Sequence, residues 1–303
     1  MTIAITGASG LIGTRLRQKI EESGNTARTI SRNLSDAELA EAMGSADAVV
    51  HLAGEPVAQR WTEAAKKRIY DSRVEGTQRL VRAMSVQSRR PRVLVCASAI
   101  GYYGSRGDQV LNEMSPPGAD FLAQVVMEWE GAARSAEALG VRVDSMRFGM
   151  VLGHGGALAR LLPIFRLGAG GRLGSGEQWM SWIHIEDAVN LILFALDFAV
   201  IKGPVNATSP HPVTNDEFTT RLATALHRPA FLPAPAFALK LVLGEMSEML
   251  LASQRVLPAV AKSSGFNFRF PDLHSALEDL FGSGEGDGRK HRATSQGLSL
   301  LGE

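Results

Sequence analysis

Three glycines near the amino terminus have the spacing of a phosphate-binding turn. They stand in Thr6-Gly7-Ala8-Ser9-Gly10-Leu11-Ile12-Gly13, after the apolar run Ile3-Ala4-Ile5 and before a helical pattern. Gly7 permits the tight turn, Gly10 lets backbone N–H groups approach phosphate oxygens, and Gly13 allows the helix to pack closely on the sheet. The helix N-terminus adds unpaired N–H donors and a partial positive charge. The turn therefore predicts binding of a dinucleotide pyrophosphate.

A serine and an arginine stand at the end of the second predicted strand, which spans residues 27–31. In a sheet of this kind that position faces the adenosine ribose, where an acidic side chain would bind the 2′-hydroxyl of NAD. This chain has Ser31 and Arg32 there instead. A guanidinium pairs with a 2′-phosphate and a serine hydroxyl can donate to it, so NADP(H) is the favoured cofactor. The alternative is that Arg32 is an ordinary surface arginine.

Groups that could move a proton or bind a substrate lie further along the chain. Glu55 could act as a base, whereas nothing near Tyr102 in the sequence would lower the pKa of a phenol from about 10. His184 precedes a predicted helix start, which favours a histidine that fixes a turn over a catalytic one. Trp182 is interpreted as packing between two lobes. These residues leave the catalytic group unassigned.

Alternating strands and helices would position these side chains. Apolar runs predict strands at 47–54, 92–97 and 141–148, and long helices are predicted at about 63–87 and 120–139. The alternation indicates a doubly wound parallel α/β sheet of the Rossmann type, in which ligands bind outside the carboxyl ends of the strands. The loops expected to converge there are those at Gly7, Ser31, Leu52, Ser98 and Gly149.

The chain is predicted to contain a large domain, a smaller lobe and a tail. Residues 1–152 form mainly the NADP-binding Rossmann domain, to which 180–207 return, and 153–281 form mainly a C-terminal α/β substrate lobe. Residues 282–303 are rich in glycine, serine and charge and poor in apolar side chains, which is typical of a disordered tail.

Composition narrows the functional classes. The 303 residues carry a formal net charge of +1, so no overall field favours nucleic acid or an anionic membrane, and the run Arg89-Arg90-Pro91-Arg92 is interpreted as a solvated loop. The single cysteine, Cys96, lies in an apolar run and is expected to be a buried, inert thiol. No apolar run reaches the roughly 18 residues of a membrane span, and no signal-peptide pattern precedes the first strand. We therefore expect a cytoplasmic protein.

Four motifs together resemble the extended short-chain dehydrogenases/reductases. They are Thr-Gly-x-x-Gly-x-x-Gly from residue 6, His-Leu-Ala-Gly at 51–54, Ser-x-x-x-Tyr-Tyr-Gly at 98–104 and Trp-Ile-His-Ile-Glu-Asp at 182–187. The resemblance covers about residues 2–281 and is greatest to the atypical, nucleoside-diphosphate-sugar epimerase-like subfamily. It implies a Rossmann domain that binds NADP(H) and a small C-terminal lobe that closes over the substrate.

The loop positions and the resemblance together predict which residues contact each ligand. The residues predicted to bind the cofactor are Gly7, Ser9, Gly10, Leu11, Ile12, Gly13, Ser31, Arg32, Leu52, Ala53, Gly54, Arg73, Ser98 and Val151. The candidates for the substrate pocket are Glu55, Ala99, Tyr102, Trp182 and His184. The resemblance places Arg73 near the phosphates or the nicotinamide, with a plain surface arginine as the alternative. The expected substrate is a small, sugar-like or otherwise polar molecule; no metal, nucleic acid or membrane is expected.

One part of the family pattern is missing. Active members of the superfamily carry Tyr-x-x-x-Lys on the helix after the Tyr-Gly loop, where the lysine lowers the pKa of the tyrosine that exchanges a proton with the substrate. Aligned on Glu130, this chain has Leu122 and Val126 at those positions. The usual serine falls on Ala99. The standard mechanism therefore cannot operate. Glu128 or Glu130 could face the crevice, but a solvated helix face is the favoured interpretation.

Two functions remain open. The first, which we prefer, is an NADP(H)-dependent oxidoreductase or epimerase-like enzyme without the dyad, favoured by the intact loops and by the glycine-rich segment 168–178. The second is a protein that binds NADP(H) without chemistry and senses redox state or binds a partner, favoured by the missing dyad. The resemblance also implies a homodimer formed through the helices at about 63–87 and 120–139.

Overall fold

The central sheet is parallel, and its strand order reverses beside the glycine turn. The computed structural model describes residues 1–198 and 200–282, so the predicted tail lies outside the described residues from 283 onward. Within this part, six strands pair in parallel in the order β10-β6-β4-β3-β1-β2. Their bounds are β1 (Thr2–Thr6), β2 (Thr26–Ile30), β3 (Ala48–His51), β4 (Val93–Ala99), β6 (Arg142–Phe148) and β10 (Gly203–Ala207). Because β2 and β3 lie on opposite sides of β1, the carboxyl end of β1 is the topological switch point.

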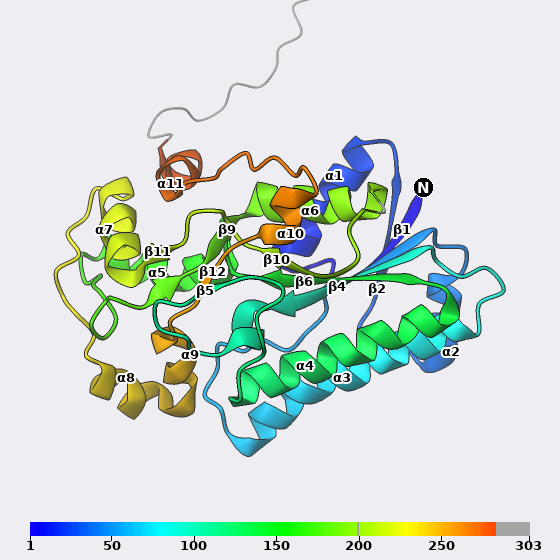
Figure 1. Cartoon of the computed structure of the whole chain (residues 1–303), viewed down its shortest axis with the longest axis horizontal. Helices are drawn as coiled ribbons and strands as arrows, with labels where there is room; N and C mark the ends of the chain where they lie inside the picture. The colour runs from blue at the N-terminus through cyan, green and yellow to red at the C-terminus, as the bar shows by residue number, and fades with distance from the viewer. Residues whose placement is uncertain (199, 283–303) are drawn as a thin grey trace, which may run out of the picture.

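Helices cover both faces of this sheet, as Figure 1 shows. One face carries α1 (Leu11–Glu22), α6 (Ile185–Asp197) and α10 (Ala259–Ser263), and the other carries α2 (Asp36–Met43), α3 (Glu63–Ser85) and α4 (Phe121–Arg134). In β1, Ile3 and Ile5 pack toward α1 and α6, whereas Ala4 packs toward the opposite face, because successive side chains of a strand alternate. The predicted doubly wound α/β Rossmann fold is therefore confirmed.

The helices that border the carboxyl edge begin in different ways. Asp120 caps α4, Thr62 caps α3, and Ser35 forms a capping box with Glu38 at the start of α2. At α1, Gly10 occupies the cap position, and within the described part of the chain no side chain caps the helix. The first-turn N–H groups of α1 are thus left for a ligand or for solvent.

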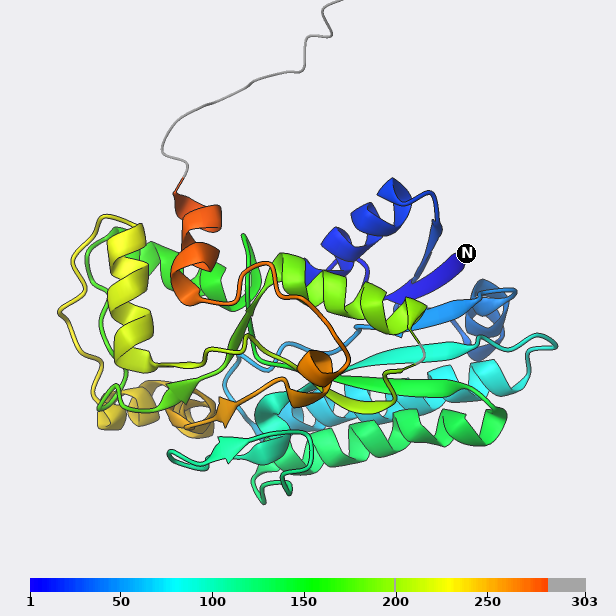
Figure 2. The ribbon, with the colours of Figure 1, turned by 45° about the horizontal axis from the view of Figure 1, so that its top comes forward.

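A smaller lobe follows the sheet strands. Its helices α5 (Gly156–Arg166), α7 (Asn215–Ala225) and α11 (Leu273–Phe281) gather around one apolar cluster and lie together in Figure 2. Short strand pairs accompany them: β7 (Met150–Leu152) with β9 (Trp182–His184), β8 (Trp179–Met180) with β11 (Val213–Thr214), and β5 (Val110–Leu111) with β12 (Arg255–Val256). The remaining elements are η1 (Ile100–Tyr103), η2 (Ser135–Leu139), α8 (Ala236–Leu243), η3 (Gly244–Met246) and α9 (Ser247–Leu251).

The structure bears on two expectations that were drawn from composition. Cys96 is buried in β4, and burial raises the pKa of its thiol, which agrees with an inert cysteine. None of the helices in the described part of the chain combines the length and apolar character needed to cross a membrane.

Candidate cofactor site

The glycine turn leaves no room for side chains in front of α1. Gly7 has a φ of +69°, and a Cβ on it would lie 2.7 Å from the carbonyl carbon of Leu52. A Cβ on Gly13 would lie 2.3 Å from the Gly7 oxygen, so neither position admits a side chain. Gly10 differs: it is exposed, its φ is −75°, and a Cβ there would lie 3.3 Å from the Gly7 oxygen. The backbone at Gly10 is ordinary, but a Cβ there would press on the Gly7 oxygen, so glycine keeps the helix N-terminus accessible, which suits a phosphate.

The other residues of the turn anchor it to the rest of the molecule. Ser9 is exposed, and Ile12 is half-buried against the core on the α1 side of the sheet. The Cδ1 atom of Leu11 lies 3.2 Å from the position of a Cβ on Gly153, which joins the start of α1 to the segment after β7. Val151 of β7 is half-buried in the same core. These contacts bring the amino-terminal turn together with the beginning of the lobe.

A buried histidine braces the loop after β3 against the end of β1. His51 Nδ1 lies 2.6 Å from Thr6 Oγ1, and His51 Nε2 lies 3.1 Å from Thr77 Oγ1. Burial lowers the pKa of His51 to about 4, so the imidazole is neutral at pH 7. Thr6 Oγ1 also accepts the N–H of Ala53 at 3.3 Å. The predicted cofactor residues 52–54 are thereby held beside Gly7.

Arg73 supports this loop from α3. A Cβ on Gly54 would lie 3.3 Å from Arg73 Cζ, and Arg73 Nη1 donates to the backbone oxygens of Glu55 at 2.9 Å and Ile69 at 3.3 Å. The guanidinium carbon lies 5.2 Å from the Trp129 ring, and burial lowers the pKa of Arg73 to about 10. Arg73 is therefore a half-buried arginine that shapes the loop, and not a free surface arginine.

A charged cluster lies where the adenosine ribose is expected. Ser31 and Arg32 follow β2 and are exposed; the Arg32 side chain is 65% accessible and its Nη1 lies 3.9 Å from Glu55 Oε2. Glu55 Oε1 lies 3.6 Å from Arg68 Nε and accepts the Gln59 amide at 3.3 Å. Sequence reasoning missed Arg68, because nothing in the sequence around it connects α3 to the loop after β3. Only contact across the loop after β3 identifies it.

Ser98 turns away from the carboxyl edge. Its hydroxyl donates to Glu130 Oε1 at 2.6 Å, and both side chains are buried. Glu130 also accepts from Arg147 Nε and Nη2, each at 2.8 Å. The interpretation of Glu130 as part of a solvated helix face is wrong, because Trp129, Val126 and Glu130 share the face of α4 that packs on the sheet domain.

The two tyrosines of η1 have different environments around the same arginine. Tyr103 is fully buried; its hydroxyl donates to Asn206 Oδ1 at 2.7 Å and accepts from Arg147 Nη1 at 3.0 Å. Burial raises the pKa of Tyr103 to about 12. Tyr102 is half-buried, and Arg147 Cζ lies 3.4 Å from its ring centroid. The sequence around Tyr102 gave no sign of this cation, which comes from β6.

The start of α4 presents apolar side chains to η1. Ala99 ends β4 and is half-buried just before η1. A Cβ on Gly101 would lie 3.5 Å from Leu122 Cβ, so the first turn of α4 lies directly against this loop. Val126 is buried one turn further along. The helix Phe121–Arg134 contains neither tyrosine nor lysine.

Trp182 and His184 both serve local structure. Trp182 is fully buried in the lobe cluster, and its Nε1 donates to the backbone oxygen of His211 at 3.1 Å. His184 is the cap residue of α6: its Nδ1 accepts the N–H of Glu186 at 3.2 Å, and its Nε2 lies 3.4 Å from Asp279 Oδ2. Burial lowers the pKa of His184 to about 4. This histidine fixes a turn, as the sequence favoured.

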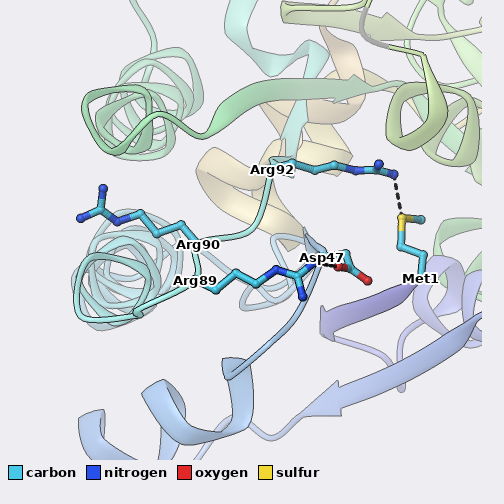
Figure 3. A pocket seen from close by; sticks show the side chains of 5 residues that line it. All are labelled: Met1, Asp47, Arg89, Arg90 and Arg92. Carbon is cyan, nitrogen blue, oxygen red and sulfur yellow. Dashed lines mark hydrogen bonds and ion pairs between the residues drawn. The ribbon is translucent and has the colours of Figure 1, made fainter.

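A hollow of about 360 Å³ lies at the opposite end of the sheet. In Figure 3 Arg89 points to Asp47, with 2.6 Å between Nη2 and Oδ1, Arg92 reaches the Met1 sulfur at 2.8 Å, and Arg90 turns away. Met1, Asp47 and Arg92 precede β1, β3 and β4, so this hollow belongs to the amino edge and not to the glycine turn. Among residues 1–198 and 200–282, no group of three or more His, Cys, Asp or Glu side chains could hold a metal ion.

Comparisons with known proteins agree with this arrangement over most of the chain. The chain is 44% identical to the chloroplastic epimerase family protein SDR39U1 homolog of Arabidopsis thaliana, covering 92% of this chain and 86% of that protein. It is 38% identical to the epimerase family protein YfhF of Bacillus subtilis, covering 92% and 98%. The crystal structure of human epimerase family protein SDR39U1 (isoform 2) with NADPH superposes with a TM-score of 0.87 at 34% identity, covering 93% of this chain and 100% of that one.

Family models divide the chain in two. Residues 234–280 match a domain of unknown function, DUF1731. Residues 3–207, which contain the whole parallel sheet and its carboxyl-edge loops, match the model described as NAD dependent epimerase/dehydratase family. By this match and by its relatives, the chain belongs to the NAD dependent epimerase/dehydratase family.

Proposed function

We propose that this protein binds NADP(H) at the carboxyl edge of the sheet and uses it as an oxidoreductase or epimerase of small molecules, without a Tyr-x-x-x-Lys dyad. The observation that carries the proposal is the turn at Gly7, Gly10 and Gly13. It combines a helix start that no side chain caps with three glycines that leave its backbone N–H groups accessible, which suits a pyrophosphate. The crystal structure of the human relative contains NADPH, which supports the same ligand for this chain.

Different residues of this edge would bind different parts of the cofactor. Backbone N–H groups at the start of α1 would bind the pyrophosphate, and Ser31 with Arg32 would bind the 2′-phosphate that distinguishes NADP from NAD. Arg68 lies on the other side of Glu55 and adds a second guanidinium to the same corner. The loop at 52–54, braced by Arg73, would form the wall behind the ribose and the pyrophosphate. When bound, the cofactor supplies or accepts a hydride.

The proton must come from a group other than the positions of the dyad. Leu122 and Val126 carry no ionisable atom. Two polar side chains near the edge can donate or accept a proton: Tyr102, stacked on the Arg147 guanidinium, and Glu55, which lies between Arg32 and Arg68. Tyr102 and Glu55 are therefore the residues to replace first.

The test begins with calorimetric titration of NADPH and NADH into the protein. Preference for NADPH is the expected result, and equal or absent binding would overturn the proposed cofactor. A panel of carbonyl compounds and sugar nucleotides then tests whether the absorbance of bound NADPH changes. Loss of turnover in Tyr102→Phe or Glu55→Gln, with NADPH affinity retained, would identify the proton-transferring group.

A second function is a protein that binds NADP(H) and performs no chemistry. The observation that favours it is that Ser98, Trp182 and His184 are all occupied in the internal structure. Under this function NADPH binds tightly but no compound of the panel changes its absorbance, and Tyr102→Phe changes nothing measurable. Any substrate-dependent oxidation of NADPH that Gly10→Ser abolishes would contradict it.

A further inference from the structure

One end of the smaller lobe carries large apolar side chains on its outer surface. The segment that runs from the end of α7 through α8 forms the left-hand end of the molecule in Figures 1 and 2. Leu232 N donates to the Gly170 oxygen at 3.2 Å, which holds the loop after α5 beside this segment. We call the large apolar residues of the two segments that are more than half exposed the apolar end; they are Leu167, Phe231, Leu232, Phe237, Leu241 and Val242.

The helix α8 is apolar on two opposite sides. On its inner side Ala236, Leu239 and Leu243 are half-buried. Phe237 and Leu241 lie on the other side, because residues of a helix follow one another at 3.6 per turn, and they are 74% and 79% exposed. None of the residues of α8 is fully buried. A helix that is apolar all round is normally covered on every side, so the outer side of α8 suits a binding partner.

The surroundings of the apolar end are basic. The stretches 153–176 and 218–244 contain no Asp or Glu, and each contains three Lys or Arg residues. Two of these cations form ion pairs, Arg172 with Asp216 at 3.7 Å and Arg221 with Glu217 at 2.8 Å. Among residues 1–198 and 200–282, no carboxylate forms an ion pair with the other four, which are Arg160, Arg166, Arg228 and Lys240. The overall charge of +1 therefore conceals a local positive excess.

A polar hollow of about 410 Å³ lies next to the apolar end. Arg228 lines the hollow and donates from Nε to the Arg166 oxygen at 3.1 Å, which brings the end of α5 to the same corner. The other lining residues are Thr220, Ala223, Thr224, His227 and Ala230. A guanidinium is a strong donor to phosphate oxygens, so the hollow suits an anionic headgroup beside the apolar side chains.

We propose that the apolar end binds the surface of a membrane that contains anionic lipids, with α8 lying in the interface. Large apolar side chains bordered by Lys and Arg are typical of helices that lie on such a surface. A second copy of the chain fits less well, because a two-fold contact would bring the same basic groups together without a carboxylate among them. The proposal does not depend on the NADP(H) function, since the apolar end shares no residue with the proposed cofactor site.

The experiment sediments the full chain with vesicles made of equal parts phosphatidylglycerol and phosphatidylcholine. Vesicles of phosphatidylcholine alone are the lipid control. We expect binding to the anionic vesicles that is at least tenfold tighter than to the neutral ones. Binding should weaken as the salt concentration rises, because salt screens exposed charges. A protein that stays in solution with anionic vesicles at low salt would overturn the proposal.

An apolar double variant locates the contact. Phe237→Ser/Leu241→Ser should weaken binding to the anionic vesicles at least tenfold, because it removes two large apolar side chains. Val86→Ser/Met114→Ser is the matched control, since it removes two exposed apolar side chains outside the apolar end. All three proteins should keep the same urea midpoint and NADPH affinity, which shows that the exposed substitutions leave the fold intact. Vesicle binding that is unchanged in the first variant, or reduced equally in the control, would contradict the assignment.

A charge variant and a measurement without lipid complete the test. Arg228→Glu/Lys240→Glu should reduce binding to anionic vesicles about tenfold, whereas Arg17→Glu, at an exposed position on α1, should change it much less. Equal reduction by Arg17→Glu would show that only overall charge matters and would contradict the site. Light scattering without lipid addresses self-association. A dimer that Phe237→Ser/Leu241→Ser dissociates, from a protein that does not bind vesicles, would assign the apolar end to a second copy instead.

Discussion

Arg147 and Glu130 form a buried two-pronged ion pair, with Nε–Oε1 and Nη2–Oε2 distances of 2.8 Å each. The pair ties β6 to α4, and Ser98 of β4 donates to the same carboxylate. Both charged side chains are 3% exposed, so neither can exchange its partner for water. β4, β6 and α4 are therefore fixed to one another by charge as well as by packing.

Breaking this pair should destabilise the fold strongly. Glu130→Leu or Arg147→Met leaves one buried charge without its partner, and we expect a loss of about 3–5 kcal/mol in the free energy of unfolding. The double variant Glu130→Leu/Arg147→Met removes both charges and should lose less than the sum of the single variants. Urea denaturation of all four proteins measures this. Strict additivity would show that the two side chains do not depend on each other.

Gly10→Ser should separate folding from cofactor binding. Serine is a favourable helix cap and the φ of −75° at position 10 suits any residue, whereas its Cβ would lie 3.3 Å from the Gly7 oxygen; these effects oppose each other, so the free energy of unfolding should change by less than about 1 kcal/mol. Its side chain would occupy the N–H groups and the space reserved for phosphate, so NADPH affinity should fall at least tenfold. Gly131→Ala, at an open position within α4, is the control and should leave NADPH binding intact. Unchanged affinity in Gly10→Ser would place the pyrophosphate elsewhere.

Arg32→Ala should distinguish the two nicotinamide cofactors. A lost charged hydrogen bond costs about 1.5–3 kcal/mol, so NADPH affinity should fall about 10- to 150-fold while NADH affinity barely changes. Arg68→Ala should act in the same direction but more weakly, because Arg68 is also held by Gln59. Arg17→Ala, an exposed arginine on α1, is the comparison. Equal losses for NADPH and NADH would exclude a 2′-phosphate contact at Arg32.

His51 should make the fold less stable in acid. Burial lowers the pKa of His51 to about 4 from an ordinary value of 6.5, so between these pH values the unfolded chain binds a proton that the folded chain does not. Its contribution to stability is complete above pH 6.5 and is lost at up to about 1.4 kcal/mol per pH unit as the pH falls toward 4. Burial raises the pKa of Asp144 to about 7, which acts in the opposite sense. The measurement is therefore a comparison: the stability advantage of the unaltered protein over His51→Gln should shrink as the pH falls from 6.5 toward 4, and a constant difference would contradict this.

A homodimer through α3 and α4 stays a prediction. The two helices lie side by side over one face of the sheet, and Met127 is exposed on the outer side of α4. If the helices of two copies meet there, Met127→Glu should shift the protein to monomers by light scattering. If the unaltered protein is a monomer, or if the dimer persists in Met127→Glu, the predicted interface is wrong.

The sheet was predictable because its signals are local. The strands at 92–97 and 141–148 correspond to β4 and β6, since continuous apolar runs between glycine-rich or polar segments admit few other structures. The helix α2 was missed, although Ser35 followed by Glu38 carries the sequence signal of a capping box. The pairing of β5 with β12 could not be found, because it joins two-residue strands more than 140 positions apart.

The candidate site was predictable only in part. The turn at Gly7 could be predicted because steric limits on glycine act within a few residues. Arg147 beside Tyr102 could not, because nothing in either local sequence shows that β6 places a guanidinium under that ring. Glu130 was misinterpreted for the same reason: it is buried because it pairs with Arg147 of β6, and the sequence of α4 does not show that partner.

A phosphate bound at the uncapped start of α1 would act as the cap of this helix. A phosphate held by its first-turn N–H groups would complete a hydrogen-bond pattern that no side chain among the described residues completes. Binding of the phosphate and ordering of the first turn of α1 would then be thermodynamically coupled. Amide hydrogens of the first turn should exchange with solvent quickly in the free protein and slowly when NADPH is added, while those of α4, capped by Asp120, should be indifferent to it.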